Sequence, residues 1–136
     1  LLPSISANLG VYASEPEADP IAEWISSCRH FQPFARDSQL VLPGHKLPFT
    51  GLPLRLEQMI DNHVGALARL TKLLETPKVA TECFDTLFKR PVGEAEYGFA
   101  LVEAVAHLNH LWKTGKVARE RREDGAWLWQ TMTPTT

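Results

Sequence analysis

Several features that mark particular classes of protein are absent from this chain of 136 residues. No apolar run approaches the roughly 20 residues that a transmembrane helix needs, so we expect no membrane-spanning segment. No glycine-rich phosphate loop is present, and a formal net charge of -2 gives no bulk attraction to nucleic acid or to an anionic membrane. The composition, with 44% hydrophobic and 22% charged residues, is that of a soluble globular protein.

Cysteine is also scarce, because Cys28 and Cys83 are the only two and they form no CxxC pair. Together with the lack of a signal peptide, this spacing predicts free thiols and a cytoplasmic location. Nucleophilic chemistry has no candidate either, since the pair Ser26-Ser27 has no base partner and the carboxylates show no pairing for acid–base work. The sequence therefore predicts no catalytic residue and no cofactor-binding residue in this chain.

One helix is predicted within the first 51 residues. Asp19-Pro20 predicts its start, with Asp as the N-cap and Pro in the first helical position, and Pro33 predicts its end. Its apolar face is predicted at Ile21, Trp24, Ile25 and Cys28.

Two short strands are predicted on either side of this helix. Residues 9–12 form the first, which would need a partner surface to become ordered. Residues 38–42 form the second, whose apolar character is typical of a buried strand. Pro43-Gly44 ends this strand and places His45 in the following loop, where a side chain is both positioned by the sheet and accessible to a ligand.

The chain from residue 52 onward predicts three helices and a hairpin. Apolar residues recur at helical spacing over residues 52–76, 80–88 and 94–114, and Gly115 supplies the C′ position of the last helix. Asp124-Gly125 lies between two strand-like runs and predicts a tight turn. This order is the winged-helix arrangement. The apolar faces are predicted at Leu56, Met59, Ile60, Val64, Leu67, Leu70 and Leu74, at Phe84, Leu87 and Phe88, and at Tyr97, Leu101, Val105, Leu108 and Trp112.

The order of these segments resembles the C-terminal part of the metallo-β-lactamase fold, followed by the winged-helix domain of a subgroup of those hydrolases. The matching runs are residues 1–9, 40–45, 79–82, 107–111 and 115–117, together with Pro48, Asn62, His63 and Arg69. The resemblance implies a mainly α fold with a small β part. Residues 1–51 would be a remnant of an α/β metallo-β-lactamase fold, and residues 52–136 a three-helix winged-helix domain.

The same resemblance implies that His45 is a metal ligand, the last histidine of a site that holds two zinc ions. The His-x-His-x-Asp-His signature and the bridging aspartate of the family are absent, and we expect both to precede Leu1 in a longer protein. The parent protein would hydrolyse a small-molecule ester, thioester or lactam-like substrate, or a phosphodiester. The winged helix would shape or cover the active site or contribute to a homodimer. The chain by itself is expected to be inactive and to bind zinc weakly.

The remaining histidines are expected to be structural. His107 and His110 share a helix face and could chelate a metal, but no third ligand lies nearby in the sequence. His63 lies beside the predicted core and favours a packing role. His30 lies near a helix end, where a cation interacts favourably with the helix dipole.

Two other functions are open at this stage. The chain could be a free-standing winged-helix module that binds DNA or RNA through Arg119, Arg121 and Arg122. Alternatively, the same arginines could make a weak RNA contact as part of a nuclease in this family. Glu94, Glu96 and Glu103 on the third helix argue against reading of the DNA major groove. It could also be an interaction module that docks through Trp24, Phe31 and Phe34.

Overall fold

The computed structural model describes residues 1–133, so residues 134–136 of the predicted domain 52–136 lie outside the described part. Within it the fold is mainly helical with one two-stranded sheet, which confirms the coarse fold class predicted from the sequence. The α-helices and strands are α1 (Pro20–Phe31), α2 (Leu52–Leu73), α3 (Phe84–Phe88), α4 (Tyr97–Lys113), β1 (Val117–Arg121) and β2 (Trp127–Thr131). Three short 3-10 helices are η1 (Gln32–Phe34), η2 (Ala80–Cys83) and η3 (Glu94–Glu96).

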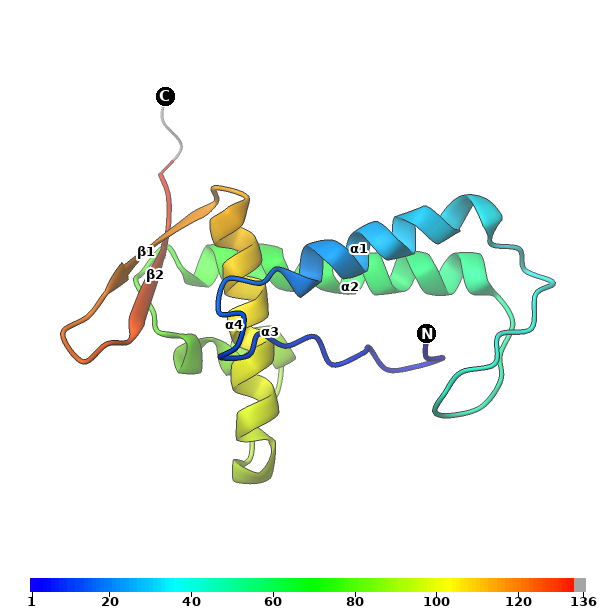
Figure 1. The fold of residues 1–136 in the computed structure, drawn as a ribbon, viewed down its shortest axis with the longest axis horizontal. Helices are drawn as coiled ribbons and strands as arrows, with labels where there is room; N and C mark the ends of the chain where they lie inside the picture. Colours follow the sequence, from blue (N-terminus) through cyan, green and yellow to red (C-terminus); the bar gives the residue numbers. More distant parts are fainter. Residues whose placement is uncertain (134–136) are drawn as a thin grey trace.

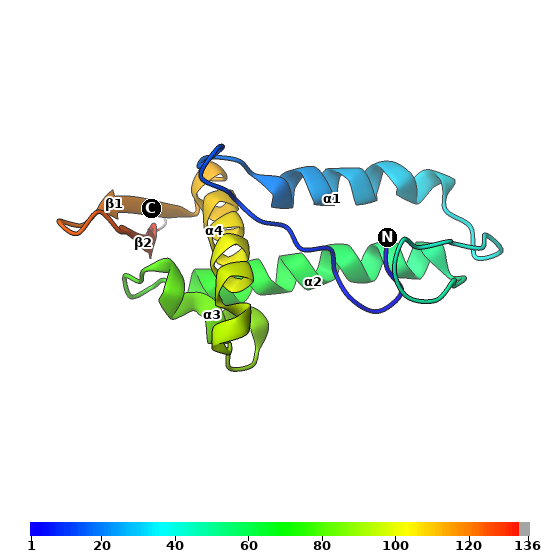
Figure 2. The same cartoon turned by 60° about the horizontal axis from the view of Figure 1, so that its bottom comes forward.

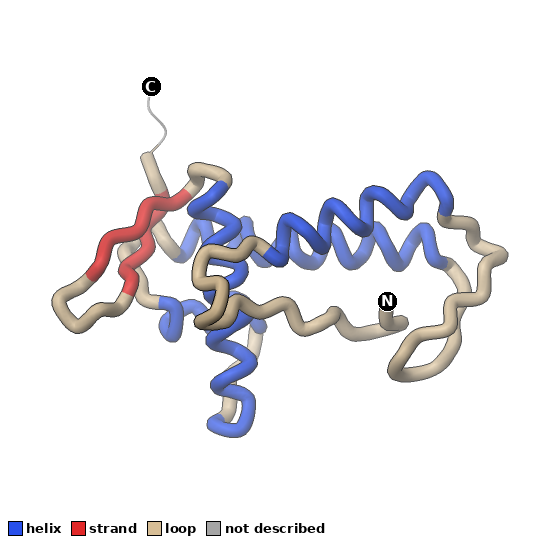
Figure 3. The backbone as a smooth tube through the Cα atoms, in the orientation of Figure 1, coloured by secondary structure: helices blue, strands red, loops and turns tan. Residues whose placement is uncertain are grey.

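The two helices α1 and α2 lie side by side along the long axis of the molecule and run in opposite directions (Figure 1). Helix α4 crosses α2 close to the start of α1, and the hairpin β1–β2 lies beyond the C-terminal end of α2 (Figure 2). A long loop between α1 and α2 occupies the opposite end of the molecule (Figure 3). The N-terminal segment runs from near that loop to α4 before α1 begins.

Helix α1 begins as predicted. The carboxylate of Asp19 accepts a hydrogen bond from the backbone N–H of Ala22 at 3.0 Å, and Pro20 occupies the first helical position. Ile21, Ile25 and Cys28 are buried against α2 and α4, and Trp24 is half-buried beside them.

The buried face of α2 differs from the prediction at one position. Val64 is 47% exposed, whereas the neighbouring His63 is 2% exposed. The buried positions Leu56, Ile60, His63, Leu67, Leu70 and Leu74 are separated alternately by four and three residues, which keeps them on one face. His63 rather than Val64 continues this spacing, so the apolar character of Val64 misled the prediction.

The buried face of α4 is also rotated from the predicted one. Tyr97 is exposed, while Leu101, Val105 and Trp112 are only partly buried and Leu108 is fully buried. The small side chains of α4 allow close approach to its neighbours, because the distance between packed helices depends on the side chains at the contact. The buried residues of α4 are Ala100, Ala104, Ala106, His107, Leu108, Asn109 and Leu111.

The predicted hairpin is confirmed. Strands β1 and β2 are antiparallel, with Arg119 opposite Trp129 and Arg121 opposite Trp127. The connecting turn contains Gly125 at a φ of +86°, a conformation that favours glycine. Trp129 also pairs through its backbone with Lys78 and is 1% exposed, so the hairpin is anchored in the core.

Neither of the two strands predicted in the first 51 residues forms. Residues 38–42 make only one bridge, between Val41 and Phe49, and Leu40 and Leu42 are 64% and 74% exposed. A strand needs neighbours that satisfy its backbone groups, and this segment has no further strand partner within residues 1–133. Residues 9–12 cross α4 instead, where Val11 donates a hydrogen bond to the carbonyl of Val102 at 3.0 Å.

A glycine is required at this crossing, because a Cβ atom on Gly10 would lie 2.8 Å from the side chain of Val102.

Across residues 1–133, no helix combines the length and apolar character needed to traverse a lipid bilayer.

Candidate functional site

The loop that carries His45 lies at the end of the molecule opposite the hairpin. Residues 44–47 are exposed, Lys46 has a φ of +72°, and the Val41–Phe49 bridge closes the loop. Within residues 1–133, no three His, Cys, Asp or Glu side chains are placed to hold a metal ion together. The residues present therefore do not fit a zinc site by themselves, and the role of His45 as a metal ligand stays a prediction.

The N-terminal segment is held along α2, starting from the helix end nearest this loop. The guanidinium of Arg55 donates hydrogen bonds to the carbonyls of Leu2 and Ile5, the latter at 3.0 Å. Further along α2, the amide of Asn62 donates to the hydroxyl of Ser6 at 3.3 Å. These contacts make the N-terminal segment one wall of a cleft.

This cleft, hereafter the α2–α4 cleft, has a volume of about 650 Å³. Its walls are the N-terminal segment, α2, the chain after α3 and the first half of α4. Its polar lining includes Asn62, Arg69, Arg90, Glu96 and Glu103. Arg69 also donates to the carbonyls of Thr86 and Leu87, which ties the end of α3 to α2.

A buried pair of histidines lies behind the α2–α4 cleft. His107 Nδ1 is 2.8 Å from the carbonyl oxygen of Glu103, which can only accept, so Nδ1 carries the proton. Burial lowers the pKa of His107 to about 4, so its Nε2 is unprotonated at neutral pH. His63 Nδ1 lies 3.3 Å from that nitrogen and must donate to it.

The second nitrogen of His63 is therefore an acceptor. Burial lowers the pKa of His63, which keeps its Nε2 unprotonated, and this buried atom has no hydrogen-bond partner in the described part of the chain. His63 lines a small cavity of about 70 Å³ that Arg69 and Glu103 also line. Burial raises the pKa of the Glu103 carboxyl to about 7. The arrangement places a fixed neutral imidazole and a partly protonated carboxyl around one cavity.

The sequence prediction missed this pair. His63 and His107 are 44 residues apart, and only the crossing of α2 and α4 brings them together. His107 and His110 do not act as a pair, because His110 Nδ1 lies 3.1 Å from the carboxylate of Asp19 at the start of α1. The available signal was the position of both His63 and His107 next to predicted core residues.

The three arginines of the predicted RNA contact have different surroundings. The guanidinium of Arg119 lies 3.7 Å from the ring centre of Trp112 and 4.2 Å from that of Trp127, and it pairs with Glu17 at 3.1 Å. Arg122 pairs with Asp124 at 2.7 Å in the turn. Arg121 is exposed and has no ion-pair partner within residues 1–133.

Comparison with known proteins bears on this architecture. Residues 67–132 match the family model described as "Metallo-beta-lactamase-like, C-terminal domain". The chain is similar to a beta-lactamase domain protein from Burkholderia ambifaria, at 36% identity and a TM-score of 0.90, covering 96% of this chain and 38% of that one. It is also similar to a metallo-beta-lactamase family protein from Thermus thermophilus, at 27% identity and a TM-score of 0.79, covering 97% of this chain and 40% of that one. No curated protein matches the sequence.

The part of the chain from the end of α2 to the end of the hairpin therefore matches a C-terminal domain of the metallo-β-lactamase-like type. The sequence and structural similarities are consistent with a C-terminal fragment of a metallo-β-lactamase-like protein, as the sequence resemblance implied. The chain spans about two fifths of the length of the solved structures that it matches.

Proposed function

We propose that this chain is the C-terminal part of a zinc-dependent hydrolase of the metallo-β-lactamase superfamily. The similarity over 96% of the chain to a beta-lactamase domain protein carries the proposal. The exposed position of His45 supports it, because a metal ligand must be accessible to the remainder of its site. The bond hydrolysed would be an ester, thioester or lactam-like bond of a small molecule, or a phosphodiester.

We assign no step of the hydrolysis to the described residues, since they do not complete a metal site. Their contribution in this proposal is to bind and orient the substrate. The α2–α4 cleft begins beside the N-terminal segment and has a volume within the roughly 300–1,000 Å³ that ligand pockets occupy. Arg69 supplies positive charge there, whereas the charge of Arg90 is neutralised by Glu96 at 2.8 Å. Glu103 can donate or accept a proton near neutral pH.

The winged-helix description belongs to the same proposal. Residues 52–136 would form the winged helix and residues 1–51 the last part of the hydrolase domain. The order α2, α3, α4, β1 and β2 supports the first part of this division. Helix α1 shares one hydrophobic core with α2 and α4, so in this proposal the two parts are packed as one unit.

Substitution of His45 tests the proposal in the protein as its gene encodes it. Replacing a residue that only supports a metal ligand weakens metal binding by roughly 10–100-fold. His45→Ala removes a proposed ligand itself, so zinc binding should weaken by at least that factor, and the rate of hydrolysis should fall with it. His30→Ala is the matched control, because His30 is also an exposed histidine but lies in the last turn of α1 and not in that loop. Bound zinc is measured by elemental analysis and titration. Unchanged zinc binding and hydrolysis in His45→Ala would remove the metal-ligand proposal.

The other sequence predictions remain proposals of narrower scope. The two free, buried cysteines support a cytoplasmic location, and a homodimer is proposed without a specific interface. A weak RNA contact would have to rely mainly on Arg121 and Arg122, because Arg119 is engaged by Glu17 and the tryptophans. If this contact exists, the protein should bind RNA with an affinity that falls as the salt concentration rises, and the double variant Arg121→Gln/Arg122→Gln should lose this binding. Binding that does not respond to salt would count against it.

A further inference from the structure

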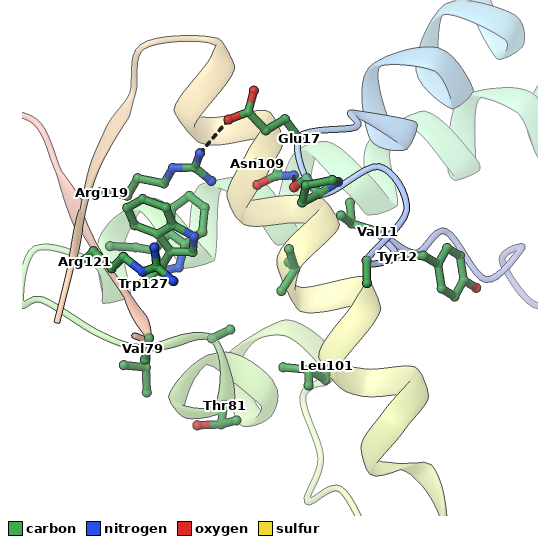
Figure 4. A pocket seen from close by; sticks show the side chains of 16 residues that line it. Val11, Tyr12, Glu17, Val79, Thr81, Leu101, Asn109, Arg119, Arg121 and Trp127 are labelled. Atoms are coloured by element: carbon green, nitrogen blue, oxygen red, sulfur yellow. Dashed lines mark hydrogen bonds and ion pairs between the residues drawn. The ribbon is translucent and has the colours of Figure 1, made fainter. Parts of the chain in front are cut away.

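A second cavity lies on the hairpin side of α4, away from the loop that carries His45 (Figure 4). Strands β1 and β2 form one wall, and α4, the chain before α1 and η2 form the others. Its volume of about 560 Å³ is that of a small-molecule site. Apolar side chains such as Leu101, Val105 and Trp127 supply much of its lining. We call it the hairpin groove.

One polar atom in the hairpin groove lacks a partner. Asn109 is 0% exposed, and its amide nitrogen donates to the carbonyls of Pro16 and Ala18 at 2.9 and 3.0 Å. These bonds fix the orientation of the amide, so the atom left over is the oxygen. That Oδ1 atom is buried and has no hydrogen-bond partner among the described residues. A buried acceptor without a donor costs free energy, and a ligand N–H or O–H would remove that cost.

The second polar feature is positive charge. Strand alternation places Arg119 and Arg121 on the same face of the hairpin, beside Trp127. Arg119 pairs with Glu17, whereas Arg121 has no carboxylate partner within residues 1–133. Figure 4 shows Arg121 beside Trp127, and Asn109 on α4 close to Glu17. The hairpin groove thus offers one unneutralised guanidinium, an apolar wall beside the Trp127 ring on which Arg119 stacks, and one buried acceptor.

We propose that the hairpin groove binds a planar aromatic carboxylate that also carries an N–H or O–H group. The carboxylate pairs with Arg121, since a guanidinium matches carboxylate geometry. The aromatic body packs against the apolar wall of α4 at Leu101 and Val105, beside the Trp127 ring on which Arg119 already stacks. The donor group reaches Asn109 Oδ1. This site requires neither a metal nor His45, so it is independent of the proposed hydrolysis.

Indole-3-acetate is the probe, because it combines a carboxylate, a flat ring and one N–H. Calorimetric titration of the protein as its gene encodes it should show one saturable site. Indole-3-acetamide lacks the charge and benzofuran-3-acetate lacks the N–H at nearly the same shape. Each should bind about tenfold more weakly or worse, the effect expected when one charge-assisted or buried hydrogen bond is lost.

The variant Arg121→Gln should likewise weaken indole-3-acetate binding about tenfold. Arg122→Gln is the control, because Arg122 is exposed, lies in the turn and does not line the groove. Both residues are exposed, so both variants should fold, which circular dichroism verifies. His45→Ala should bind the probe normally, even if it loses zinc.

Three results would overturn the proposal. One is the absence of binding in the gene-encoded protein, where another segment would then fill the groove. The second is equal affinity for all three ligands, which would mean apolar adhesion alone. The third is equal loss in Arg121→Gln and Arg122→Gln, which would mean a general charge effect.

Discussion

The two ends of helix α2 differ in how their side chains are used. At its C-terminal end, Leu74 is fully buried and Trp129 of the hairpin is 1% exposed. At its N-terminal end, the loop between α1 and α2 exposes several leucines, and Leu47 reaches 79% exposure. One backbone bridge, between Val41 and Phe49, closes that loop.

The hairpin end of the molecule therefore contributes to the stability of the fold, whereas the loop end leaves its side chains accessible to other molecules. The hairpin end is anchored by pairing of both its strands and by Lys78, which forms backbone hydrogen bonds with Trp129 of 3.0 and 2.8 Å. Clustered exposed apolar residues, as in the loop, mark interaction surfaces more often than stabilising ones. The loop end is also where His45 lies, so the proposed functional residue belongs to the less buried end.

The largest expected effect tests this contrast directly. Trp129→Ala in this chain should lower the free energy of unfolding by about 3–5 kcal/mol, because it empties a fully buried site. Leu42→Ala should change it by less than about 0.5 kcal/mol, because Leu42 is exposed. Urea-induced unfolding followed by circular dichroism measures both. Similar losses in the two variants would break the comparison, whereas a larger Leu42 effect in the gene-encoded protein would show that the loop packs on the remaining chain.

The second-largest expected effect is on the pH dependence of the free energy of unfolding, and it comes from the histidine pair His63–His107, which lies between the two ends. Burial lowers the pKa of His107 to about 4, while the unfolded chain protonates it near its ordinary value of 6.5. The stability contributed by neutral His107 is therefore complete above pH 6.5 and is lost as the pH falls towards 4. Burial raises the pKa of Glu103 from 4.5 to about 7, so its contribution is complete below pH 4.5 and is lost as the pH rises through 7.

The contributions of His107 and Glu103 to stability change in opposite directions with pH. The variant Glu103→Gln removes the titrating carboxyl and leaves only the histidine contribution. Between pH 6.5 and 4 the variant should lose about 3 kcal/mol of unfolding free energy, more steeply than the parent chain, because only the histidine contribution remains. His63 acts in the same direction as His107, since burial lowers its pKa as well. Urea unfolding at several pH values measures the slope. A variant profile parallel to that of the parent chain would contradict the assignment.

The smallest effect distinguishes two neighbouring arginines at the hairpin end. Arg119→Gln should cost about 1–2 kcal/mol, because the guanidinium is enclosed by Trp112 and Trp127 and its side chain is 10% exposed. Arg121→Gln should cost almost nothing, since Arg121 is exposed and has no ion-pair partner in the described part of the chain. Thermal unfolding compares the two. Equal shifts in Tm would show that the stack contributes no stability.

Local signals predicted the start of α1, the end of α4 and the hairpin, whereas the predicted helices at 80–88 and 94–114 begin with 3-10 turns. The Asp19-Pro20 cap, the glycine after α4 and the Asp124-Gly125 turn each involve groups only a few residues apart, so their free energies are local. The prediction of a buried strand at residues 38–42 was wrong, because apolar composition alone does not supply a pairing partner.

The sequence by itself determined where the helices and the turn form, because capping, periodicity and turn geometry act within a few residues. It also carried the resemblance to the metallo-β-lactamase family. The tertiary structure decided that His63 meets His107, that the oxygen of Asn109 lacks a donor, and that Arg119 rather than Arg121 is enclosed. Each of these depends on the angle at which α4 crosses its neighbours, and that angle results from packing across the whole core.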